Sequence, residues 1–377
     1  MIYFDNSATT CTNSEVAKYV CDCSTKLFYN PSSVYAPSIN VKNILNEARA
    51  KMLKMLHASS SDNLYFTGSA TEANNIILNG LARKNKKILV SIGEHPSVFE
   101  TAKNLKNNGF NVEFINLTKD GLLDIQHLKT LLNSDVGLVS FIHVSNETGA
   151  INDIASISKL IKQTVPTCLV HCDGVQAFCK VDVNLSNTMV DAYTISSHKI
   201  CGPKGVGAFY LRHGVNLKPS VFGGGQESNI RPGTENLPGI LGFVKAAELM
   251  QANFISNNKK IADLKAYMIQ KLEQNCTNYI INAQKANTSP YVLSVSFKEV
   301  RGEVLLHALE KYEIYVSTGS ACSSKIAGNR VLTAMGQNQN DILGNIRFSF
   351  CNDNTKEEVD FVIEKLSYEL NNLRRIK

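Results

Sequence analysis

Short apolar segments alternate with stretches of helical character over residues 60–211, and this alternation limits the possible fold more than any other feature of the chain. The expected strands cover residues 64–67, 88–91, 112–115, 136–143, 167–172, 191–195 and 205–211. Strands that alternate with helices usually pair in parallel, because each helix returns the chain to the same end of the sheet. The pattern therefore predicts an α/β domain with a mainly parallel sheet that helices cover on both faces. In such a sheet, ligands bind at the carboxyl edge of the strands.

The pattern changes after residue 253. A helix over residues 237–253 ends the alternating part of the chain. The remainder predicts helices at residues 261–274, at 302–310 and from 355 onward, with a strand at 292–297. We interpret this remainder as a smaller α+β domain that the first residues of the chain complete. The expected organisation is a large domain at residues 12–252 and a small domain formed by residues 1–11 and 253–377.

Composition narrows the class of protein. The 377 residues are 44% hydrophobic and 19% charged, as is typical of a soluble globular protein, and none of the apolar stretches is long enough to span a bilayer. The first residues lack the basic and apolar regions of a signal peptide, so we expect a cytoplasmic protein. The net charge of +6 comes without a block of lysines and arginines, so we expect no direct contact with nucleic acid or membranes.

Ten cysteines in a cytoplasmic chain are expected to be reduced thiols. They do not show the paired spacing of zinc ligands, so we expect no metal site. Most of them are expected to fill cores, and Cys322 is the exception. It lies in the run of small residues at 317–324, which predicts a surface loop that exposes its thiol.

Two polar residues at strand ends point to a cofactor. Lys199 follows the expected strand at residues 191–195 and enters a loop rich in glycine and proline, and Asp173 directly follows the preceding strand. A lone lysine in such a loop is most often an exposed surface residue. The nearby carboxylate favours another interpretation. Pyridoxal phosphate needs a lysine to hold its aldehyde as a Schiff base, and an acid to keep its pyridine nitrogen protonated.

The segment at residues 67–75 predicts a site for the cofactor phosphate. It places small residues between a strand and a helix that begins near Thr71, where first-turn N–H groups and the Thr71 hydroxyl can bind an anion. Alone, this pattern is more typical of an ordinary helix start capped by Thr71. Together with Lys199 it favours a phosphate site, and we expect the neighbouring Ser196 and His198 to complete it.

Three further polar residues lie in or after expected strands. His95 is suited to stacking on a pyridine ring and to proton transfer near neutral pH, although a loop histidine before a helix is about as common. Asn146 is either a turn residue or a donor to the cofactor or to the substrate carboxylate. Arg347 lies in an expected strand, where a charged side chain needs a partner. A guanidinium that binds the carboxylate of an amino acid satisfies this need.

Several motifs, in one order along nearly the whole chain, resemble those of cysteine desulfurases of the NifS/IscS type. The motifs lie at residues 5–10, 30–33, 71–75, 94–95, 146–149, 173–177, 196–199, 223–227 and 319–322. A set of ordered motifs is far more specific than any single match. These enzymes belong to the class V aminotransferase-like group of fold-type I pyridoxal-phosphate-dependent enzymes. The resemblance implies an α/β large domain with a mainly parallel sheet and a smaller α+β domain.

The resemblance also implies a role for each candidate residue. Lys199 would form the Schiff base, His95 would stack on the ring and transfer protons, and Cys322 would be the nucleophile that carries a persulfide. The expected cofactor-binding residues are Ala70, Thr71, His95, Asn146, Asp173, Gln176, Ser196, His198, Lys199 and Thr234. Thr234 would reach across from the second subunit of a homodimer. Arg347 and Asn146 would bind the substrate.

The sequence thus predicts a homodimeric cysteine desulfurase that depends on pyridoxal phosphate. It would convert L-cysteine to L-alanine and leave the sulfane sulfur on Cys322, for delivery to an iron–sulfur scaffold or to a protein of tRNA or cofactor thiolation. The alternative among enzymes is a selenocysteine lyase or another class V enzyme, and Cys322 argues against a plain aminotransferase. The alternative from another class is a non-enzymatic sulfur-transfer scaffold. An intact set of candidate catalytic residues argues against it: Lys199, Asp173, His95, Arg347 and Cys322.

Overall fold

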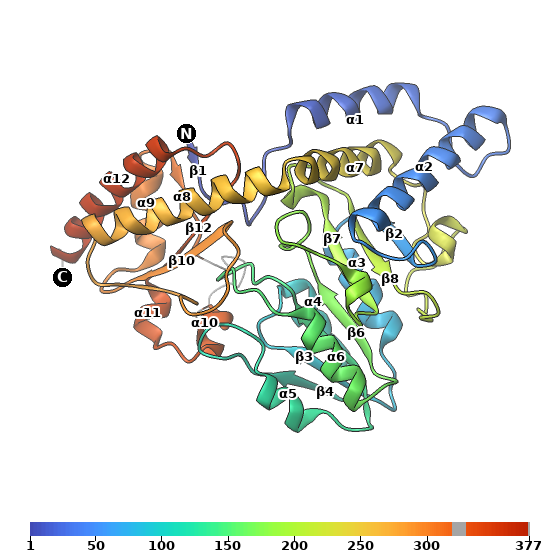
Figure 1. The fold of residues 1–377 in the computed structure, drawn as a ribbon, viewed down its shortest axis with the longest axis horizontal. Coiled ribbons are helices and arrows are strands. Elements are labelled where there is room, and N and C mark those ends of the chain that lie inside the picture. Colours follow the sequence, from blue (N-terminus) through green and yellow to red (C-terminus); the bar gives the residue numbers. More distant parts are fainter. Residues whose placement is uncertain (319–328, 376–377) are drawn as a thin grey trace.

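A seven-stranded sheet forms the centre of the larger part of the molecule in the computed structural model, which describes residues 1–318 and 329–375. Its strands are β2 (Asn63–Thr67), β3 (Lys87–Ser91), β4 (Val112–Ile115), β5 (Val136–Ile142), β6 (Leu169–Asp173), β7 (Ala192–Ser196) and β8 (Gly207–Leu211). Their order is β2-β8-β7-β6-β5-β3-β4 (Figure 1). The strands from β4 to β7 pair in parallel, and β8 runs antiparallel between β7 and β2. The predicted α/β fold with a mainly parallel sheet is confirmed.

Helices cover both faces of this sheet, because successive side chains of each strand point to opposite apolar cores. In β8, Ala208 and Tyr210 belong to one core, and Phe209 and Leu211 belong to the other. The surrounding helices are α1 (Ser14–Lys26), α2 (Ala36–Met55), α3 (Ala70–Leu81), α4 (Pro96–Asn107), α5 (Ile125–Leu131), α6 (Ile154–Thr164) and α7 (Leu237–Ala252). The core on one face includes residues of α3 and α4, and the core on the other includes residues of α2, α6 and α7.

A second group of elements packs around a core of its own. It consists of β1 (Ile2–Tyr3), β9 (Tyr279–Ile281), β10 (Val292–Phe297), β11 (Ile314–Tyr315), β12 (Asn345–Ser349), α8 (Phe254–Asn275), α9 (Gly302–Glu310), α10 (Arg330–Ala334), α11 (Gln339–Leu343) and α12 (Lys356–Arg375). β9, β10 and β12 form an antiparallel sheet, and β1 pairs in parallel with β11. Phe4 is fully buried in this core beside residues of α8 and α12, so the start of the chain packs with its end. The domain boundary at residue 253 stays a prediction.

The helices that connect the large sheet to the second group of elements begin and end at other residues than expected. The sequence predicts a helix that starts at residue 261 after a polar stretch at 256–260, but α8 already begins at Phe254. Asn253 alone separates it from α7. The polar stretch is helical because its side chains lie mainly on the exposed side of α8, while Ile261 and later apolar residues face the core at helical spacing. Neither α8 nor another helix in the described part of the chain is long and apolar enough to cross a membrane.

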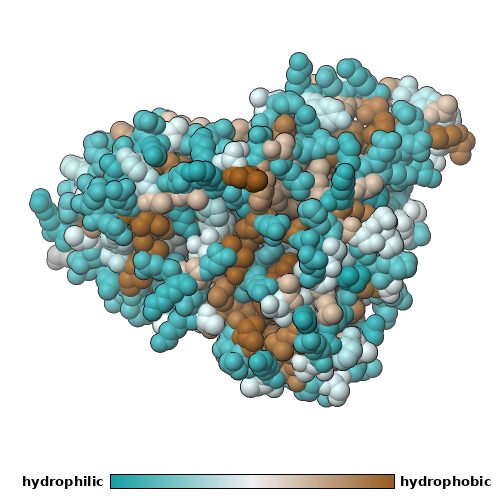
Figure 2. Space-filling model, in the orientation of Figure 1, coloured by the Kyte–Doolittle hydropathy of each residue, from teal (hydrophilic) through white to brown (hydrophobic). Residues whose placement is uncertain are grey.

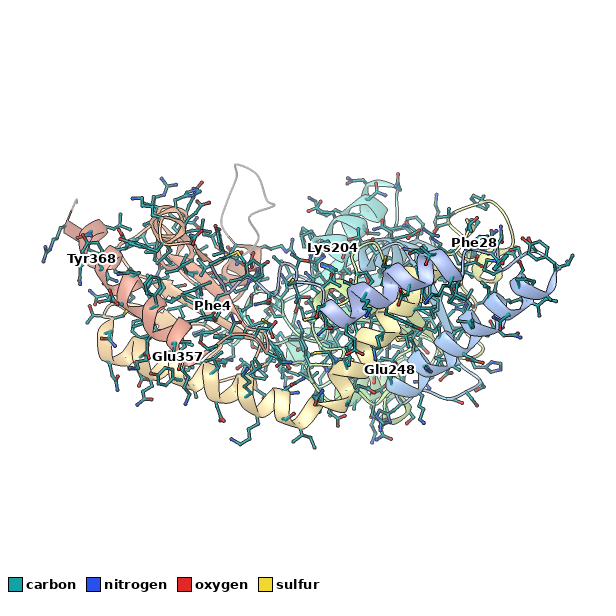
Figure 3. All side chains as sticks on the ribbon, turned by 90° about the horizontal axis from the view of Figure 1, so that it is seen from above. Phe4, Phe28, Lys204, Glu248, Glu357 and Tyr368 are labelled. Carbon is teal, nitrogen blue, oxygen red and sulfur yellow. The ribbon has the colours of Figure 1, made fainter. Side chains whose placement is uncertain are left out.

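Apolar side chains are exposed at one end of the molecule, along the connection between α1 and α2. Phe28 is 69% exposed and Val34 is 91% exposed. Figure 2 shows apolar atoms at this end, and Figure 3 shows Phe28 at the end opposite to Tyr368 of α12. Such side chains are candidates for contact with another protein surface.

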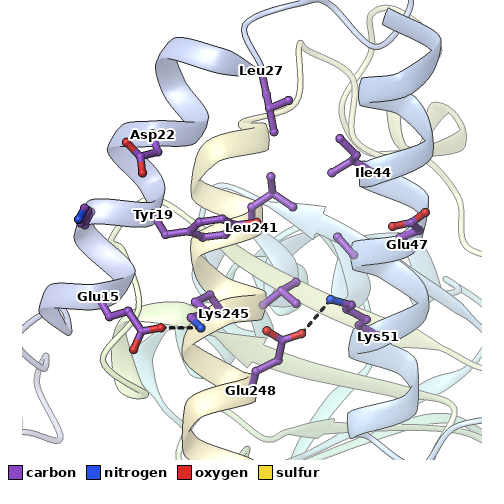
Figure 4. Close-up of a pocket in the computed structure, with 13 residues that line it drawn as sticks. Glu15, Tyr19, Asp22, Leu27, Ile44, Glu47, Lys51, Leu241, Lys245 and Glu248 are labelled. Atoms are coloured by element: carbon purple, nitrogen blue, oxygen red, sulfur yellow. Dashed lines mark hydrogen bonds and ion pairs between the residues drawn. The ribbon is translucent and has the colours of Figure 1, made fainter. Parts of the chain in front are cut away.

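A hollow of about 560 Å³ separates α1 and α2 above α7 (Figure 4). Ion pairs between Glu15 and Lys245, and between Lys51 and Glu248, connect its walls at 2.6 and 2.9 Å. These pairs are partly exposed, so each contributes little to stability. None of the predicted site residues lies in this hollow.

Candidate active site

A cavity of about 410 Å³ opens at the carboxyl edge of the large sheet. Its walls include Ile142 and Asp173, the last residues of β5 and β6, and Lys199, which follows β7. The predicted site residues that line it are Ala70, Thr71, His95, Asn146, Asp173, Gln176, His198, Lys199 and Arg347. The fold therefore brings together residues that are far apart in the sequence, at the edge where parallel sheets bind ligands.

Lys199 ends a short 3-10 helix, η2 (Ser197–Lys199), which follows β7 directly. Its Nζ donates hydrogen bonds to the carbonyl oxygens of Ser7 and Ala8, each at 2.6 Å. Burial, together with the positive charges of Lys180 and Arg347, lowers the pKa of Lys199 to about 7. A large fraction of this amine is therefore neutral near pH 7, as the attack of a lysine on an aldehyde requires.

A hydrogen-bond network connects Asp173 with His95. Asn74 Nδ2 donates to Asp173 Oδ2 and to Ser97 Oγ, both at 2.8 Å. Ser97 Oγ lies 2.8 Å from Nδ1 of His95, and the backbone N–H of Ser97 donates to the same Nδ1 at 3.2 Å. Asn74 and Ser97 therefore hold the two predicted cofactor contacts in a fixed relation to each other.

These contacts also determine the protonation of His95. Since Nδ1 accepts a backbone N–H, the proton of the neutral ring must be on Nε2. Burial lowers the pKa of His95, which favours the neutral ring near pH 7. His95 is also the N-cap of α4, so its position depends on the start of that helix.

The start of α3 supplies donors for an anion. The sequence predicts a helix that begins near Thr71, with Thr71 as its cap in the alternative interpretation. Helix α3 begins at Ala70, and Ser69 Oγ accepts from the backbone N–H of Glu72 at 3.1 Å. Serine is at least as good a cap as threonine, so the cap moves back by two residues. Ala70 and Thr71 line the cavity, and N–H groups of a first turn have no acceptor within the helix. A Cβ at Gly207 would lie 2.6 Å from the Ser69 backbone, so β8 passes this helix start closely.

Ser196 and His198 flank the lysine segment in different settings. Ser196 is buried and does not line the cavity, and its Oγ has no hydrogen-bond partner within the described residues. His198 lines the cavity, its Nδ1 lies 3.1 Å from Thr9 Oγ1, and burial lowers its pKa to about 4. An unpartnered buried hydroxyl is costly unless a bound group satisfies it. The first-turn N–H groups of α3 at the cavity wall fit a phosphate, and Lys199 and Asp173 fit the aldehyde and the ring nitrogen of pyridoxal phosphate.

Arg347 extends from β12 into the cavity, and its guanidinium is held on two sides. Nη2 donates to Asp5 Oδ1 at 2.7 Å, and Nη1 donates to the carbonyl oxygen of Asn146 at 2.9 Å. Nε is buried and has no partner within the described residues. The side chain of Asn146 lines the cavity and donates to Glu147 Oε1 at 3.0 Å. An arginine fixed in this way still offers donors to a carboxylate.

Thr234, like Ser196, does not line this cavity, and it is exposed before α7. Cys322 lies outside the described residues. Described residues on both sides of the segment 319–328, which contains Cys322, are held beside the cavity. Ser317 lines it and donates from its backbone N–H to the Arg347 carbonyl oxygen at 3.2 Å. Asn329 Nδ2 donates to Glu147 Oε2 at 3.0 Å.

Sequence reasoning missed several residues of the site. Asn74 and Ser97 carry the network behind His95, and Ser7 and Asp5 contact Lys199 and Arg347. A polar residue among the buried positions of a helix is a signal that could have identified Asn74, which is fully buried in α3. The sequence offers no such local signal for the N-terminal segment, because its contacts depend on where the segment packs.

Known proteins resemble the whole chain. A model of the class V aminotransferase family matches residues 2–362. A cysteine desulfurase of Trichormus azollae is 35% identical over 380 residues, covering 100% of this chain and 94% of that protein. Cysteine desulfurase IscS 1 of Archaeoglobus fulgidus is 36% identical, covering 99% of this chain and 98% of that protein. The solved structure of a NifS-like protein is 34% identical with a TM-score of 0.91, covering 98% of this chain and 99% of that one.

The fold, the cavity and these matches define a pyridoxal-phosphate-dependent enzyme of the class V aminotransferase type. Within that class, the chain belongs to the cysteine desulfurase family. The family, the fold class and the cofactor that the sequence predicts are therefore confirmed, while the roles of the individual residues stay predictions.

Proposed function

We propose that this protein is a cysteine desulfurase that converts L-cysteine to L-alanine and retains the sulfane sulfur on Cys322 as a persulfide. One contact carries the proposal. Ser317 lines the cavity and pairs with the backbone of Arg347, and it precedes Cys322 by five residues in the sequence. Five residues span at most about 18 Å, so a thiol at this distance along the chain can reach a substrate that Arg347 binds.

In this proposal the chain's own residues bind the substrate and move its protons. Arg347 binds the α-carboxylate through donors that Asp5 and Asn146 leave free. Lys199, whose pKa is about 7, takes the proton from the α-carbon, and Asp173 holds a proton on the ring nitrogen. When bound, pyridoxal phosphate supplies an electron-withdrawing ring that stabilises negative charge on the α-carbon.

Sulfur transfer in this proposal needs no further oxidant. The thiolate of Cys322 attacks the substrate sulfur, an S–S bond forms, and the Cβ–S bond breaks with a proton added at Cβ. One L-cysteine and one protein thiol thus give one L-alanine and one protein persulfide. An acceptor must then remove the sulfane sulfur, and we propose an iron–sulfur scaffold or a protein of tRNA or cofactor thiolation in the cytoplasm.

We also propose that the enzyme is a homodimer in which Thr234 contacts the cofactor phosphate of the partner. Two observations support a second copy of the chain as the partner that covers the exposed apolar side chains between α1 and α2. Phe28 and Val34 are exposed, and Phe222, in the segment that leads to Thr234, is 86% exposed. Thr234 itself is exposed and so is available to a neighbouring subunit.

Mass spectrometry tests the sulfur step. The enzyme loaded with cofactor is exposed briefly to L-cysteine without reductant, and the Cys322 peptide is expected to gain one sulfur atom. Cys322→Ser should keep the cofactor and release almost no alanine, whereas Cys21→Ser, at an exposed cysteine of α1, should retain wild-type turnover. Wild-type turnover of cysteine by Cys322→Ser would show that another group accepts the sulfur. It would favour a selenocysteine lyase or another class V reaction.

A further inference from the structure

Lys180 is a buried lysine next to the active site that the proposed reaction does not use. It lies in the turns that follow β6 and is 4% exposed, and none of the ion pairs within the described residues includes it. Its Nζ donates to Gln176 Oε1 at 3.2 Å and lies 5.4 Å from the ring centre of Tyr291. A buried ammonium without a carboxylate partner is costly, so its retention here calls for a role.

The contact with Lys180 allows one orientation of the Gln176 amide. An ammonium has donors only, so it requires the amide oxygen, and the amide nitrogen then faces the other way. There Nε2 donates to the carbonyl oxygen of Ser7 at 3.0 Å, which is an acceptor only. Both neighbours therefore select the same orientation. The second N–H of Gln176, which lines the cavity, is left as a donor to an acceptor bound there.

The same contacts lead to the reactive lysine. The carbonyl oxygen of Ser7 that accepts from Gln176 also accepts from Lys199 Nζ at 2.6 Å. Lys180 and Lys199 are thus joined through one amide and one carbonyl group. The arrangement fixes the side of the site on which Gln176 is predicted to contact the cofactor.

We infer that Lys180 is a positioning residue of the active site, which orients the Gln176 amide as a donor and places a fixed positive charge behind Lys199. The inference rests on the proposed function only in that Lys199 and Gln176 are taken as the cofactor contacts. It assigns to Lys180 no contact with the substrate.

The charges around both lysines are consistent with this role. Lys199 faces the positive charges of Lys180 and Arg347 and the negative charges of Asp5 and Asp173. After burial, Lys180 is the largest cause that lowers the pKa of Lys199. Its removal should therefore raise that pKa.

The groups around Lys180 leave its charge uncompensated. The thiols of Cys179, Cys201 and Cys351 and the phenol of Tyr291 are its neighbours, and burial raises the pKa of each of them. All four groups are therefore neutral near pH 7. Burial lowers the pKa of Lys180 itself to about 8, so most of it carries its charge at pH 7.

The test compares Lys180→Met with Lys265→Met. Methionine keeps an apolar stem and removes the charge. Lys265 is a matched control, because burial lowers its pKa to about 8 as well, but its Nζ contacts Thr288 and Ser289 and not the site. Two readouts use the cofactor-free protein without cysteine. They are the pH midpoint for acetylation of Lys199, followed by peptide mass spectrometry, and the dissociation constant of pyridoxal phosphate.

Lys180→Met is expected to raise the Lys199 midpoint by about half a pH unit or more, the size of a single nearby charge, and to weaken cofactor binding about 10-fold. Lys180→Arg should keep the midpoint near that of the wild type, and Lys265→Met should change neither readout. Wild-type values of both readouts in Lys180→Met would overturn the inference, as would equal changes in Lys265→Met. Because cysteine is absent, these outcomes do not depend on whether Cys322 accepts sulfur.

A double-mutant cycle tests the path through Gln176. If Lys180 acts by orienting that amide, Lys180→Met should weaken cofactor binding less than about twofold in a Gln176→Ala background. If Lys180→Met weakens cofactor binding by the same factor with and without Gln176→Ala, the positioning role is overturned. Thermal unfolding of each variant in the same buffer identifies a general loss of stability. Such a loss would lower the unfolding temperatures of Lys180→Met and Lys265→Met alike.

Discussion

Arg347 Nη2 lies 2.7 Å from Asp5 Oδ1, in an ion pair between residues 342 positions apart in the chain. Arg347 is 4% exposed and Asp5 is partly exposed, so water reaches the pair mainly from the carboxylate side. The carbonyl oxygen of Asn146 holds the other arm of the guanidinium. The arginine is therefore oriented before a substrate arrives, and little side-chain entropy is lost when it binds a carboxylate.

Arg347→Ala is expected to raise the KM for L-cysteine by about 10- to 100-fold, because a charge-assisted bond to the α-carboxylate is lost. Cofactor binding should remain. Arg347→Lys should recover only part of the affinity, since an ammonium cannot reproduce the two parallel bonds of the guanidinium. Steady-state kinetics measure both effects. An unchanged KM in the alanine variant would assign the carboxylate to another residue.

Lys199→Ala should lose the covalent attachment of pyridoxal phosphate and lower turnover by about 1,000-fold or more, because both the aldehyde partner and the base are removed. Borohydride reduction of the wild type, followed by peptide mapping, should place the pyridoxyl group on Lys199. Lys204→Ala, at an exposed lysine of the same loop (Figure 3), is the control and should behave as the wild type. A label on a different lysine would refute the assignment.

Asp173→Ala should retain some cofactor and lose most activity, about 100-fold or more, because an unprotonated pyridine ring is a poor electron acceptor. Asn74→Ala should cost less, about 10-fold, since it removes one hydrogen bond to Asp173 Oδ2 and leaves the carboxylate in place. Single-turnover absorbance measurements with cysteine compare the two variants. Near-normal turnover in Asp173→Ala would exclude its predicted role.

His171 makes the stability of the cofactor-free protein depend on pH. It is fully buried between Ser140 Oγ at 2.8 Å and Thr194 Oγ1 at 3.1 Å, and burial lowers its pKa to about 3. The unfolded chain, with a pKa of about 6.5, binds the proton first. The contribution of His171 to stability is therefore complete above pH 6.5 and declines below it by up to about 1.4 kcal/mol per pH unit.

Urea unfolding at pH 7.5 and at pH 5.5 measures this effect. Wild type is expected to lose about 1 kcal/mol more between these pH values than His171→Gln, whose side chain does not titrate. Equal losses in the two proteins would show that His171 is not the group responsible.

The proposed dimer predicts a mass of twice 41.4 kDa in solution. Phe28→Asp should shift the protein toward the monomer, because it places a charge in the apolar contact, and should weaken cofactor binding by withdrawing the partner's Thr234. Tyr368→Asp, at the opposite end of the molecule (Figure 3), should leave both properties unchanged. Light scattering measures the mass. A monomeric wild type would contradict the dimer.

The parts of the site that could be predicted are those with a local pattern. Lys199 and Asp173 follow apolar strands, and the order of strands and helices fixes that both reach one edge of the sheet. The hydrogen-bond network of Asn74 and Ser97 is harder to predict from the sequence, because polar residues near helix starts commonly bond to the local backbone. Lys180 was overlooked for a similar reason: a lysine in a turn is normally exposed, and only packing shows that this one is buried.

The prediction of a break before residue 261 was wrong for a physical reason. A polar stretch indicates exposure, and exposure is compatible with a helix that has one apolar face. The helix predicted to begin near Thr71 begins at Ala70, and Ser69 is its cap, so the alternative interpretation of Thr71 as the cap is wrong. The sequence carries no local signal for the docking of residues 5–8 on Lys199 and Arg347.

That docking has a consequence for how the enzyme is made. During synthesis, Asp5 leaves the ribosome more than 300 residues before Arg347, its partner in the finished site. The large sheet and the contacts of Ser7 and Thr10 beside Lys199 can form while translation continues, but the ion pair with Arg347 must wait for β12. A nascent chain that lacks β12 therefore contains the cofactor lysine without its complete surroundings. The competent site assembles as a late event, when the beginning of the polypeptide meets its last strand.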